Sequence, residues 1–193
     1  MPAIGAPGEQ ATLSNTAAAV LGMVALGARS GYDVRRAAER SLRFFWALGA
    51  PQIYAQLKHL EKSGLIAGRD DARGERARRV FTVTAAGEAA MRTWIAAPDA
   101  AGALELRDPE LLRLFFADAA GPADALASIG RMRRRSDRSL ELFRSEILPA
   151  AARTTQSGAA FPERVAAFGV ELHEFIRDWC RRLERELADE GAG

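Results

Sequence analysis

The sequence is poor in cysteine and histidine, the residues on which many catalytic and metal sites depend. Its 193 residues include one cysteine, Cys180, and two histidines, His59 and His173. A single cysteine excludes an intramolecular disulfide and any Cys/His metal spacing. The chain also lacks GxSxG, HExxH, P-loop and dinucleotide-binding glycine motifs. We therefore expect no catalytic residue, no metal and no cofactor, in a protein that is not an enzyme.

Long apolar runs are missing too. The apolar run at residues 17–28 is too short to span a bilayer, and the start of the chain lacks the basic and apolar segments of a secretion signal. We therefore expect a cytoplasmic protein without a membrane partner. Hydrophobic residues make up 48% of the chain, which is typical of a globular protein.

The charge is unevenly distributed although its total is small. The formal net charge is +2, but residues 1–99 carry 13 Lys+Arg against 9 Asp+Glu, while residues 100–193 carry 14 against 16. A basic N-terminal half beside a slightly acidic C-terminal half is typical of an electrostatic footprint confined to one domain.

Residues 50–64 predict a short amphipathic helix that ends at a glycine. Ile53, Leu57 and Leu60 recur at spacings of four and three residues, which places them on one buried face. The opposite side of the helix is uncharged or basic, and the side chains there and on its flanks can meet phosphates and base edges. These side chains are Gln52, Tyr54, Ala55, Gln56, Lys58, His59 and Lys62. Alone, such a helix is more typical of a solvated surface.

The segment that follows changes this interpretation. Residues 65–84 predict a β-hairpin whose long tip surrounds Gly74. It is crowded with arginines, namely Arg69, Arg73, Arg76, Arg78 and Arg79. Arginine charge by itself more often marks a solvated face. A basic hairpin directly after a helix with a basic outer face, however, indicates the wing of a winged helix-turn-helix.

Two helices are expected before the central one. Ser14 or Asn15 can cap the first, which ends near Gly27, and the second extends from Tyr32 to about Arg43. An apolar connection that we expect to pack in the core follows: Phe44, Phe45, Trp46 and Leu48. After the hairpin, a further helix begins at Thr84 and ends before Pro98.

Several short motifs occur in a fixed order over residues 14–97. They are Gly31-Tyr32, Trp46, Gln52-Ile53-Tyr54 with Leu57, Leu60, Glu61, Gly64 and Leu65, and Arg78-Arg79 leading into Thr84 and Gly87. Together they resemble the N-terminal domain of the PadR family of transcriptional regulators, and several parts in order are far more specific than one helix-turn-helix match. The sequence departs from the family at Ala50-Pro51, where a small polar residue and glycine are usual, and this could alter how the helix enters the DNA groove.

The resemblance implies a double-stranded DNA partner and assigns residues to it. Gln52 and Gln56 would read base edges, with a contribution from the methyl group of Ala55, while the basic side chains would attract phosphates in a salt-sensitive way. Tyr54 would either bind a phosphate or pack on a flank. The implied DNA-binding residues are Gln52, Tyr54, Ala55, Gln56, Lys58, His59, Lys62, Arg69, Arg76, Arg78 and Arg79.

The second half of the chain is predicted to be helical. We expect a disordered arm at 1–12, the winged domain at 13–98, a linker at 99–107 and a helical dimerisation domain at 108–190. Asp108-Pro109-Glu110 is typical of a helix start, and the apolar residues after it predict core packing. A long helix is then expected from Pro122 to Leu148, where Pro149 would end it.

The charged run in that long helix has two interpretations. Arg131, Arg133, Arg134, Arg135 and Arg138 could form a second nucleic-acid site. Acidic residues are interleaved downstream at helical spacing, which favours a solvated face instead.

The last predicted helix carries an apolar stripe at spacings of three and four residues. The stripe consists of Phe161, Val165, Phe168, Leu172, Phe175, Trp179 and Leu183. The segment resembles the virulence-activator type of PadR C-terminal domain, in which long helices of two subunits pack together; a hairpin within one chain is the alternative.

The resulting expectation is a mainly α protein, with a winged helix-turn-helix bearing a two-stranded wing and a helical dimerisation domain. Its expected function is that of a homodimeric repressor on an inverted-repeat operator, with the small aromatic or hydrophobic effector that the family implies for some members. The competing interpretation is a winged-helix module that binds protein without specific DNA binding.

Overall fold

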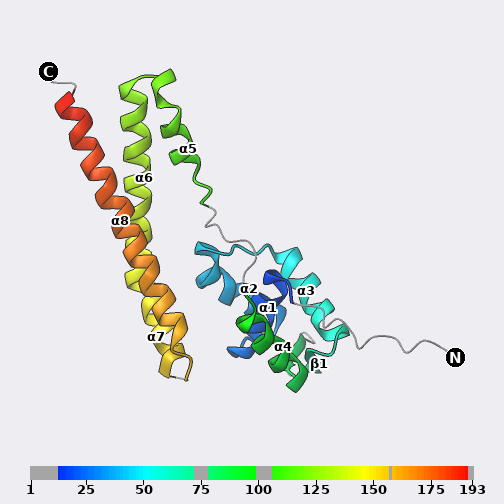
Figure 1. The fold of residues 1–193 in the computed structure, drawn as a ribbon. Helices are drawn as coiled ribbons and strands as arrows, with labels where there is room; N and C mark the ends of the chain where they lie inside the picture. The colour runs from blue at the N-terminus through cyan, green and yellow to red at the C-terminus, as the bar shows by residue number, and fades with distance from the viewer. Residues whose placement is uncertain (1–12, 72–77, 99–105, 157, 191–193) are drawn as a thin grey trace. The chain divides into compact units, whose positions relative to one another are not determined.

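The computed structural model describes residues 13–71, 78–98, 106–156 and 158–190. The chain divides into two compact units, a winged unit at residues 1–100 and a helical unit at residues 101–193 (Figure 1). The expected arm at 1–12 and most of the expected linker lie outside the described residues.

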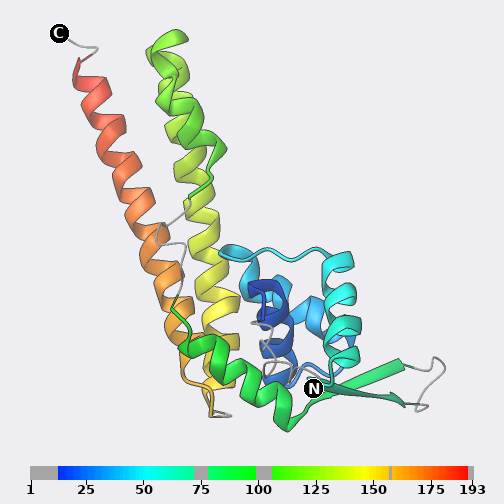
Figure 2. The same cartoon turned by 45° about the vertical axis from the view of Figure 1, so that its right-hand side comes forward.

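The winged unit contains helices followed by a hairpin and a final helix. The elements are α1 (Asn15–Ala25), α2 (Gly31–Arg40), η1 (Leu42–Phe44), α3 (Ala50–Lys62), β1 (Ile66–Asp71), β2 (Arg78–Val83) and α4 (Ala85–Ala96). The strands pair antiparallel, with Ile66 opposite Val83, and Figure 2 shows the hairpin extending away from the helices. This is the predicted winged helix-turn-helix with a two-stranded wing.

The core of the winged unit uses the predicted apolar faces. Ile53 and Leu60 of α3 are fully buried with Leu21 of α1 and Val34 of α2, and the base of the wing adds Ile66 and Phe81. Burial of such side chains contributes about 1.5–3 kcal/mol each. The face of α3 that bears Gln52, Lys58 and Lys62 is therefore turned outward by packing of its opposite side.

Local caps set the ends of these helices. The Ser14 hydroxyl accepts a hydrogen bond from the Ala17 N–H at 3.2 Å, so Ser14 caps α1. Ser30 and Asp33 form a reciprocal capping box at the start of α2. Gly64, with a φ of +71°, lies in the left-handed region and lets the chain leave α3 for β1.

The prediction for the end of the second helix is wrong. Helix α2 ends at Arg40 because Ser41, with φ −130°, leaves the helical conformation, and a 3-10 turn follows. The core prediction for the apolar connection is also wrong for Phe45 and Trp46, which are 59% and 37% exposed. The turn places both rings outward, while Leu48 packs on the core.

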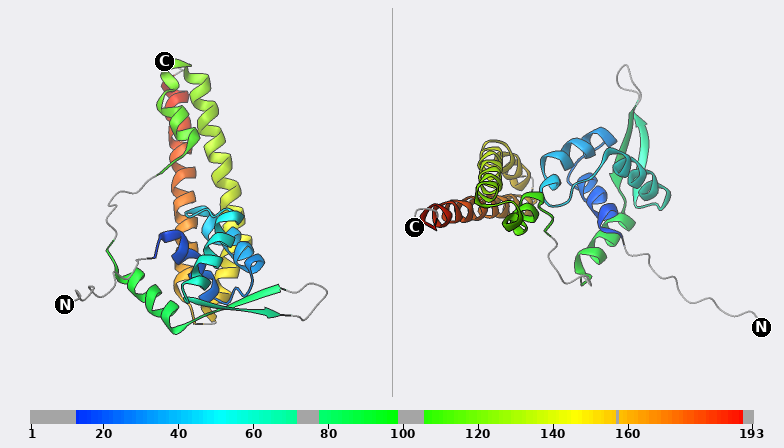
Figure 3. Two further views of the ribbon diagram at one scale, coloured as in Figure 1. Left: turned by 90° about the vertical axis from the view of Figure 1, so that its right-hand side faces the viewer. Right: turned by 90° about the horizontal axis from the view of Figure 1, so that it is seen from above.

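The helical unit is built on two long helices that lie side by side in antiparallel directions (Figures 1 and 3). Its elements are α5 (Pro109–Phe115), η2 (Ala117–Ala119), α6 (Pro122–Leu142), the π-helical segment η3 (Phe143–Ile147), α7 (Leu148–Gln156) and α8 (Phe161–Glu190). Ile129, Met132 and Cys180 form its buried centre, and Trp179 and Leu183 pack against them.

The prediction that Pro149 ends the long helix is wrong. The helix continues from α6 through η3 into α7, and the Leu148 N–H donates to the Phe143 carbonyl in the π-helical pattern. Pro149 lies immediately after this π-helical turn, an irregularity of the kind found where a helix bends.

The core prediction for α5 is wrong in most positions. Leu112, Phe115 and Phe116 are 61%, 79% and 62% exposed, and only Leu114 packs on the buried centre. A helix of seven residues turns one side toward α6, so the other apolar side chains face outward within one chain.

The arginines of α6 pair with acidic residues of neighbouring helices. Arg131 binds Glu110 at 2.9 Å, Arg133 binds Glu184 at 3.0 Å, and Arg135 binds Asp108. The preferred interpretation of this run, a solvated face with neutralised charge, fits these pairs better than a second nucleic-acid site does. Among the residues that the structure describes, no helix is both long and apolar enough to cross a membrane.

Candidate nucleic-acid interface

The N-terminus of helix α3 is capped by Gln52, one of the predicted base-reading residues. The Gly49 N–H donates to Oε1 of Gln52 at 2.9 Å, so Gln52 caps the first turn. Pro51 lies in that turn, where its fixed φ suits a helix start. The Ala50-Pro51 departure from the family pattern is therefore compatible with a regular α3.

The outward side of α3 carries most of the predicted contacts. Exposed side chains along it are Gln52, Tyr54, Ala55, Lys58, His59 and Lys62. Gln56 differs, because it is only partly exposed and its Oε1 is buried without a hydrogen-bond partner among the described residues. Gln56 is thus less available to a base edge than the sequence suggested.

The wing aligns charges across its two strands. Asp70 lies opposite Arg79 and Asp71 lies opposite Arg78 in the register. Opposite charges at facing positions stabilise a strand pair. Arg69 is exposed on β1, and Arg76, a predicted phosphate contact, lies outside the described residues.

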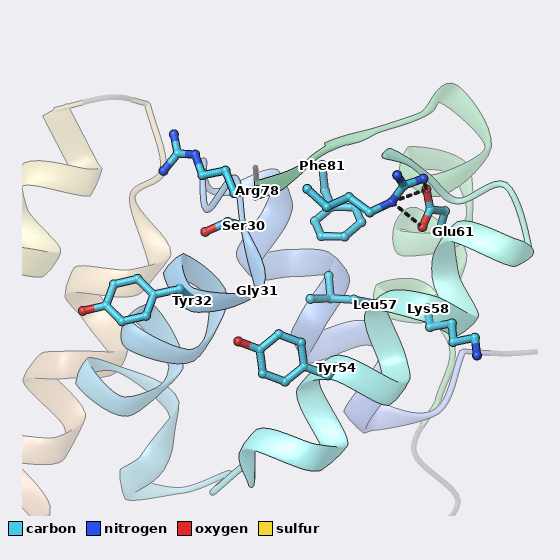
Figure 4. Close-up of a pocket in the computed structure, with 10 residues that line it drawn as sticks. Ser30, Gly31, Tyr32, Tyr54, Leu57, Lys58, Glu61, Arg78 and Phe81 are labelled. Carbon is cyan, nitrogen blue, oxygen red and sulfur yellow. Dashed lines mark hydrogen bonds and ion pairs between the residues drawn. The ribbon is translucent and has the colours of Figure 1, made fainter. Parts of the chain in front are cut away.

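A pocket of about 580 Å³ lies between the start of α2, one flank of α3 and β2 (Figure 4). Its lining combines aromatic and charged side chains, namely Tyr32, Tyr54, Leu57, Lys58, Glu61, Arg78, Arg79 and Phe81, with Ser30 and Gly31. The three stretches that form it, residues 30–32, 54–61 and 78–81, lie far apart in the sequence. The fold therefore brings α3 and the wing together on one concave surface.

Tyr54 packs on a flank of the helix, which is one of the two interpretations that the sequence allowed. Its ring packs on Gly31, where an added Cβ would lie 2.3 Å from Cε1 of Tyr54. The side chain is nevertheless 52% exposed, so its outer part remains available to a ligand. Gly31 is required here because any other residue would displace the ring.

Tyr32 is a surface residue of this pocket that was not among the predicted contacts. It is 55% exposed, and the Arg35 guanidinium lies 5.5 Å from its ring centroid. The signal was present in the Gly31-Tyr32 pair, because the glycine accommodates Tyr54 and thereby sets the two tyrosine rings near one pocket (Figure 4).

Electrostatics couple α3 to the wing. The hydrogen bond from Arg79 holds the pKa of Glu61 below its usual range, although burial opposes this, and the Gly68 N–H contributes to the lowering. The hydrogen bonds to Glu61 and then to Asp70 raise the pKa of Arg79. Both groups therefore stay charged throughout the physiological range.

The two units match two known domain families. Residues 20–93 match the Transcriptional regulator PadR-like family, and residues 106–188 match Virulence activator alpha C-term. The negative transcriptional regulator PadR of Bacillus subtilis (strain 168) is 32% identical over 78 residues, which are 40% of this chain and 43% of that protein. The chain thus matches less than half the length of this curated relative.

Solved structures resemble the chain over a larger extent. Bacillus subtilis PadR in complex with operator DNA matches with a TM-score of 0.79 and 20% identity, over 91% of this chain and 98% of that one. The complex of Bacillus subtilis PadR with p-coumaric acid matches with a TM-score of 0.71 and 20% identity, over 89% and 97%. At these identities the likeness shows the fold.

A winged helix-turn-helix followed by a long helical unit is the fold that this chain shares with the Bacillus subtilis PadR structures. The two domain matches occur in this order and together extend over most of the chain. The winged unit thus carries a PadR-like transcriptional-regulator domain, and the helical unit carries a virulence-activator C-terminal domain.

Proposed function

We propose that this protein is a homodimeric transcriptional repressor that binds inverted-repeat operator DNA through α3 and the wing. The observation that carries the proposal is that Tyr54 and Lys58, two exposed residues on one flank of α3, line the same pocket as the first residues of β2. A recognition helix in the major groove with a wing beside it contacts bases and backbone together.

The contacts divide by chemistry. Lys58, His59 and Lys62 of α3 bind phosphates, as do Arg69 and Arg78 of the wing, with Arg76 assigned from the sequence alone. Gln52 and Ala55 meet base edges, since a glutamine amide matches adenine and a methyl group contacts the thymine methyl. The hydroxyl groups of Tyr54 and Tyr32 contact the sugar-phosphate backbone of one DNA strand.

The dimer is proposed on the exposure of the α8 stripe. Phe161, Phe168 and Phe175 are 74%, 60% and 63% exposed, and Val165 and Leu172 lie between them. Large apolar side chains in one row on a helix are typical of a surface that another chain covers. A two-fold dimer also places two recognition helices about one duplex turn apart, roughly 34 Å, as an inverted repeat requires.

Trp179 and Leu183 belong to a different part of the stripe. Both pack on the buried centre formed by Ile129 and Met132 within the chain. The proposed interface is therefore centred on residues 161–175, with Trp179 and Leu183 supporting α8 from behind.

The proposed effector class is a small aromatic acid. Bacillus subtilis PadR has been solved in complex with p-coumaric acid. An effector that binds the form with low DNA affinity would release the operator by shifting the population of forms. Loss of affinity for the selected duplex on addition of p-coumaric acid or related aromatic acids tests this class.

Selection of duplexes from a random library with the full chain tests the proposed function. We expect an enriched inverted repeat with half-sites about one helical turn apart, bound with steep salt dependence. Enrichment of no sequence, together with binding that salt does not weaken, would instead favour the protein-binding module.

A further inference from the structure

One arginine of the wing is already occupied by two carboxylates. Nε of Arg79 lies 3.1 Å from both carboxylate oxygens of Glu61 in α3, and Nη1 lies 2.9 Å from Oδ1 of Asp70 in β1. Nη2 of Arg79 also donates to Glu61. The guanidinium therefore links the recognition helix to both strands of the wing, as the dashed lines at Glu61 in Figure 4 indicate in part.

Gly68 completes this cluster. A Cβ at position 68 would lie 2.2 Å from Oε1 of Glu61 and 2.8 Å from Nε of Arg79. The φ of Gly68 is not positive, so the backbone does not require glycine there. Space for the Glu61–Arg79 pair requires it.

The cluster anchors the outer part of a hairpin that has few other attachments. The base of the wing is held by a backbone hydrogen bond from Phe81 to Arg29 at 2.7 Å and by the Thr84 hydroxyl, which donates to the Gly64 carbonyl at 2.7 Å. An isolated two-stranded hairpin is marginally stable. The link from Arg79 to Glu61 joins β2 directly to the last turn of α3.

The charge balance argues against a phosphate contact at Arg79. With Glu61 and Asp70 the arginine forms a group of net negative charge, because two carboxylates face one guanidinium. A phosphate would have to displace a bidentate carboxylate, which is among the strongest partners of a guanidinium. Arg78 has a weaker contact, since its Nε lies 3.9 Å from Asp71.

We propose that Arg79 is a positioning residue, which fixes the angle of the wing to the recognition helix through Glu61, and that Arg78 supplies the phosphate contact. This inference rests on the proposed function of DNA binding. It assigns Glu61, an acidic residue on a DNA-binding surface, a favourable role in binding. Gly68 contributes to the same role, because it leaves the space that the Glu61–Arg79 pair occupies.

Glu61→Gln gives the sharpest test because the two roles of Arg79 predict opposite signs. Loss of the anchor is expected to weaken binding to the selected duplex by roughly tenfold, equivalent to about 1.4 kcal/mol. A phosphate-binding Arg79 would instead bind more tightly once the competing carboxylate is neutralised. Tighter binding by Glu61→Gln would overturn the proposal.

The salt dependence separates the two arginines. Arg79→Gln is expected to lower affinity and leave the slope of log affinity against log salt unchanged. The matched control Arg78→Gln is expected to make that slope less steep by about one unit. A salt dependence that becomes less steep by about one unit for Arg79→Gln contradicts the positioning role.

Folding and function are checked in the same series. The cluster is largely exposed, so its loss costs little stability, and circular dichroism and the thermal midpoint are expected to match those of the unmodified chain. Gly68→Ala is expected to weaken binding as Glu61→Gln does. Failure of the unmodified chain to bind any selected duplex would contradict the proposed function itself, and not only the role of Arg79.

Discussion

Gly169 of α8 lies directly against the ring of Phe143 in the π-helical segment. A Cβ at Gly169 would lie 2.3 Å from Cε1 and 2.4 Å from Cζ of Phe143. Phe143 is only 3% exposed, so its ring has little room to move. Glycine at position 169 therefore makes room for the Phe143 ring of the π-helical turn, because the ring occupies the space that any side chain at position 169 would need.

We expect Gly169→Ala to destabilise the helical unit by about 1–3 kcal/mol, since overpacking costs more than the gain of up to about 1 kcal/mol in helix propensity. Gly130→Ala in α6 is the matched control, because a Cβ there would meet only the flexible end of Arg134, at 3.2 Å. It is expected to be neutral or stabilising. Denaturant unfolding at one protein concentration measures both, and equal midpoints for the two variants would contradict the packing argument.

His173 predicts a pH dependence of stability. Burial, and then the charge of Arg135, lowers the pKa of His173 from its usual 6.5. The unfolded chain therefore takes up the proton at higher pH than the folded chain, and stability falls as the pH drops from above 6.5 through the folded pKa. His173→Gln is expected to reduce this decline between about pH 7 and pH 5. An unchanged decline of the thermal midpoint in the variant would exclude His173 as its source.

Asp108 joins the start of α5 to α6. Its Oδ1 accepts from the Glu110 N–H at 2.9 Å, and Arg135 binds the same carboxylate. Burial would raise the pKa of Asp108, but Arg135 and the Glu110 and Leu111 N–H groups outweigh it, so the pKa is lowered from 3.8. Its contribution to stability is therefore present above pH 3.8 and is lost as the pH falls through the folded pKa.

Two substitutions separate the cap from the charge at this position. Asp108→Asn retains a cap acceptor and loses the ion pair, whereas Asp108→Ala loses both, and the cap alone contributes about 1 kcal/mol. Near neutral pH we expect the unfolding midpoint to be highest for the unmodified chain, lower for Asp108→Asn and lowest for Asp108→Ala. A variant with Asn that is no more stable than the one with Ala would contradict the capping role.

The exposed stripe of α8 gives a direct test of assembly. Phe168→Ser combined with Phe175→Ser is expected to convert the proposed dimer to a monomer at micromolar concentration, because two central apolar contacts are lost. Phe45→Ser is the matched control, since Phe45 is 59% exposed against 60% for Phe168 but lies in the winged unit. Sedimentation equilibrium measures all three proteins. An unmodified chain that sediments as a monomer would contradict the dimer.

Elements set by local spacing were predictable from the sequence. The period of Ile53, Leu57 and Leu60 fixed the buried side of α3, and all three are buried. The wing and α8 followed from β-favouring residues and from a long apolar stripe. These features depend on residues within a few turns of each other, which a sequence pattern records directly.

Features that depend on more than local residue spacing were not predictable in the same way. The continuation of the helix past Pro149 depends on the π-helical turn at 143–147, and no local pattern signals that turn. Arg79 looks like any other wing arginine until Glu61, 18 residues away in sequence, is placed beside it. The outward position of Trp46 depends on where α2 ends, and element ends are poorly determined by propensity.

Gln52 has two functions that substitutions can separate. Its Oε1 caps α3 by accepting from the Gly49 N–H, while its amide N–H groups remain for a base edge. Gln52→Glu retains the cap acceptor but removes both donors, and Gln52→Ala removes both functions.

If Gln52 reads a base, both variants lose preference for the selected duplex over random DNA by about 1–3 kcal/mol. Gln52→Ala alone should also lower the thermal midpoint, and Gln52→Glu should weaken binding to all duplexes through its charge. Competition titrations with selected and random duplexes measure the preference. Equal losses on both duplexes for Gln52→Ala would leave Gln52 with the capping role only.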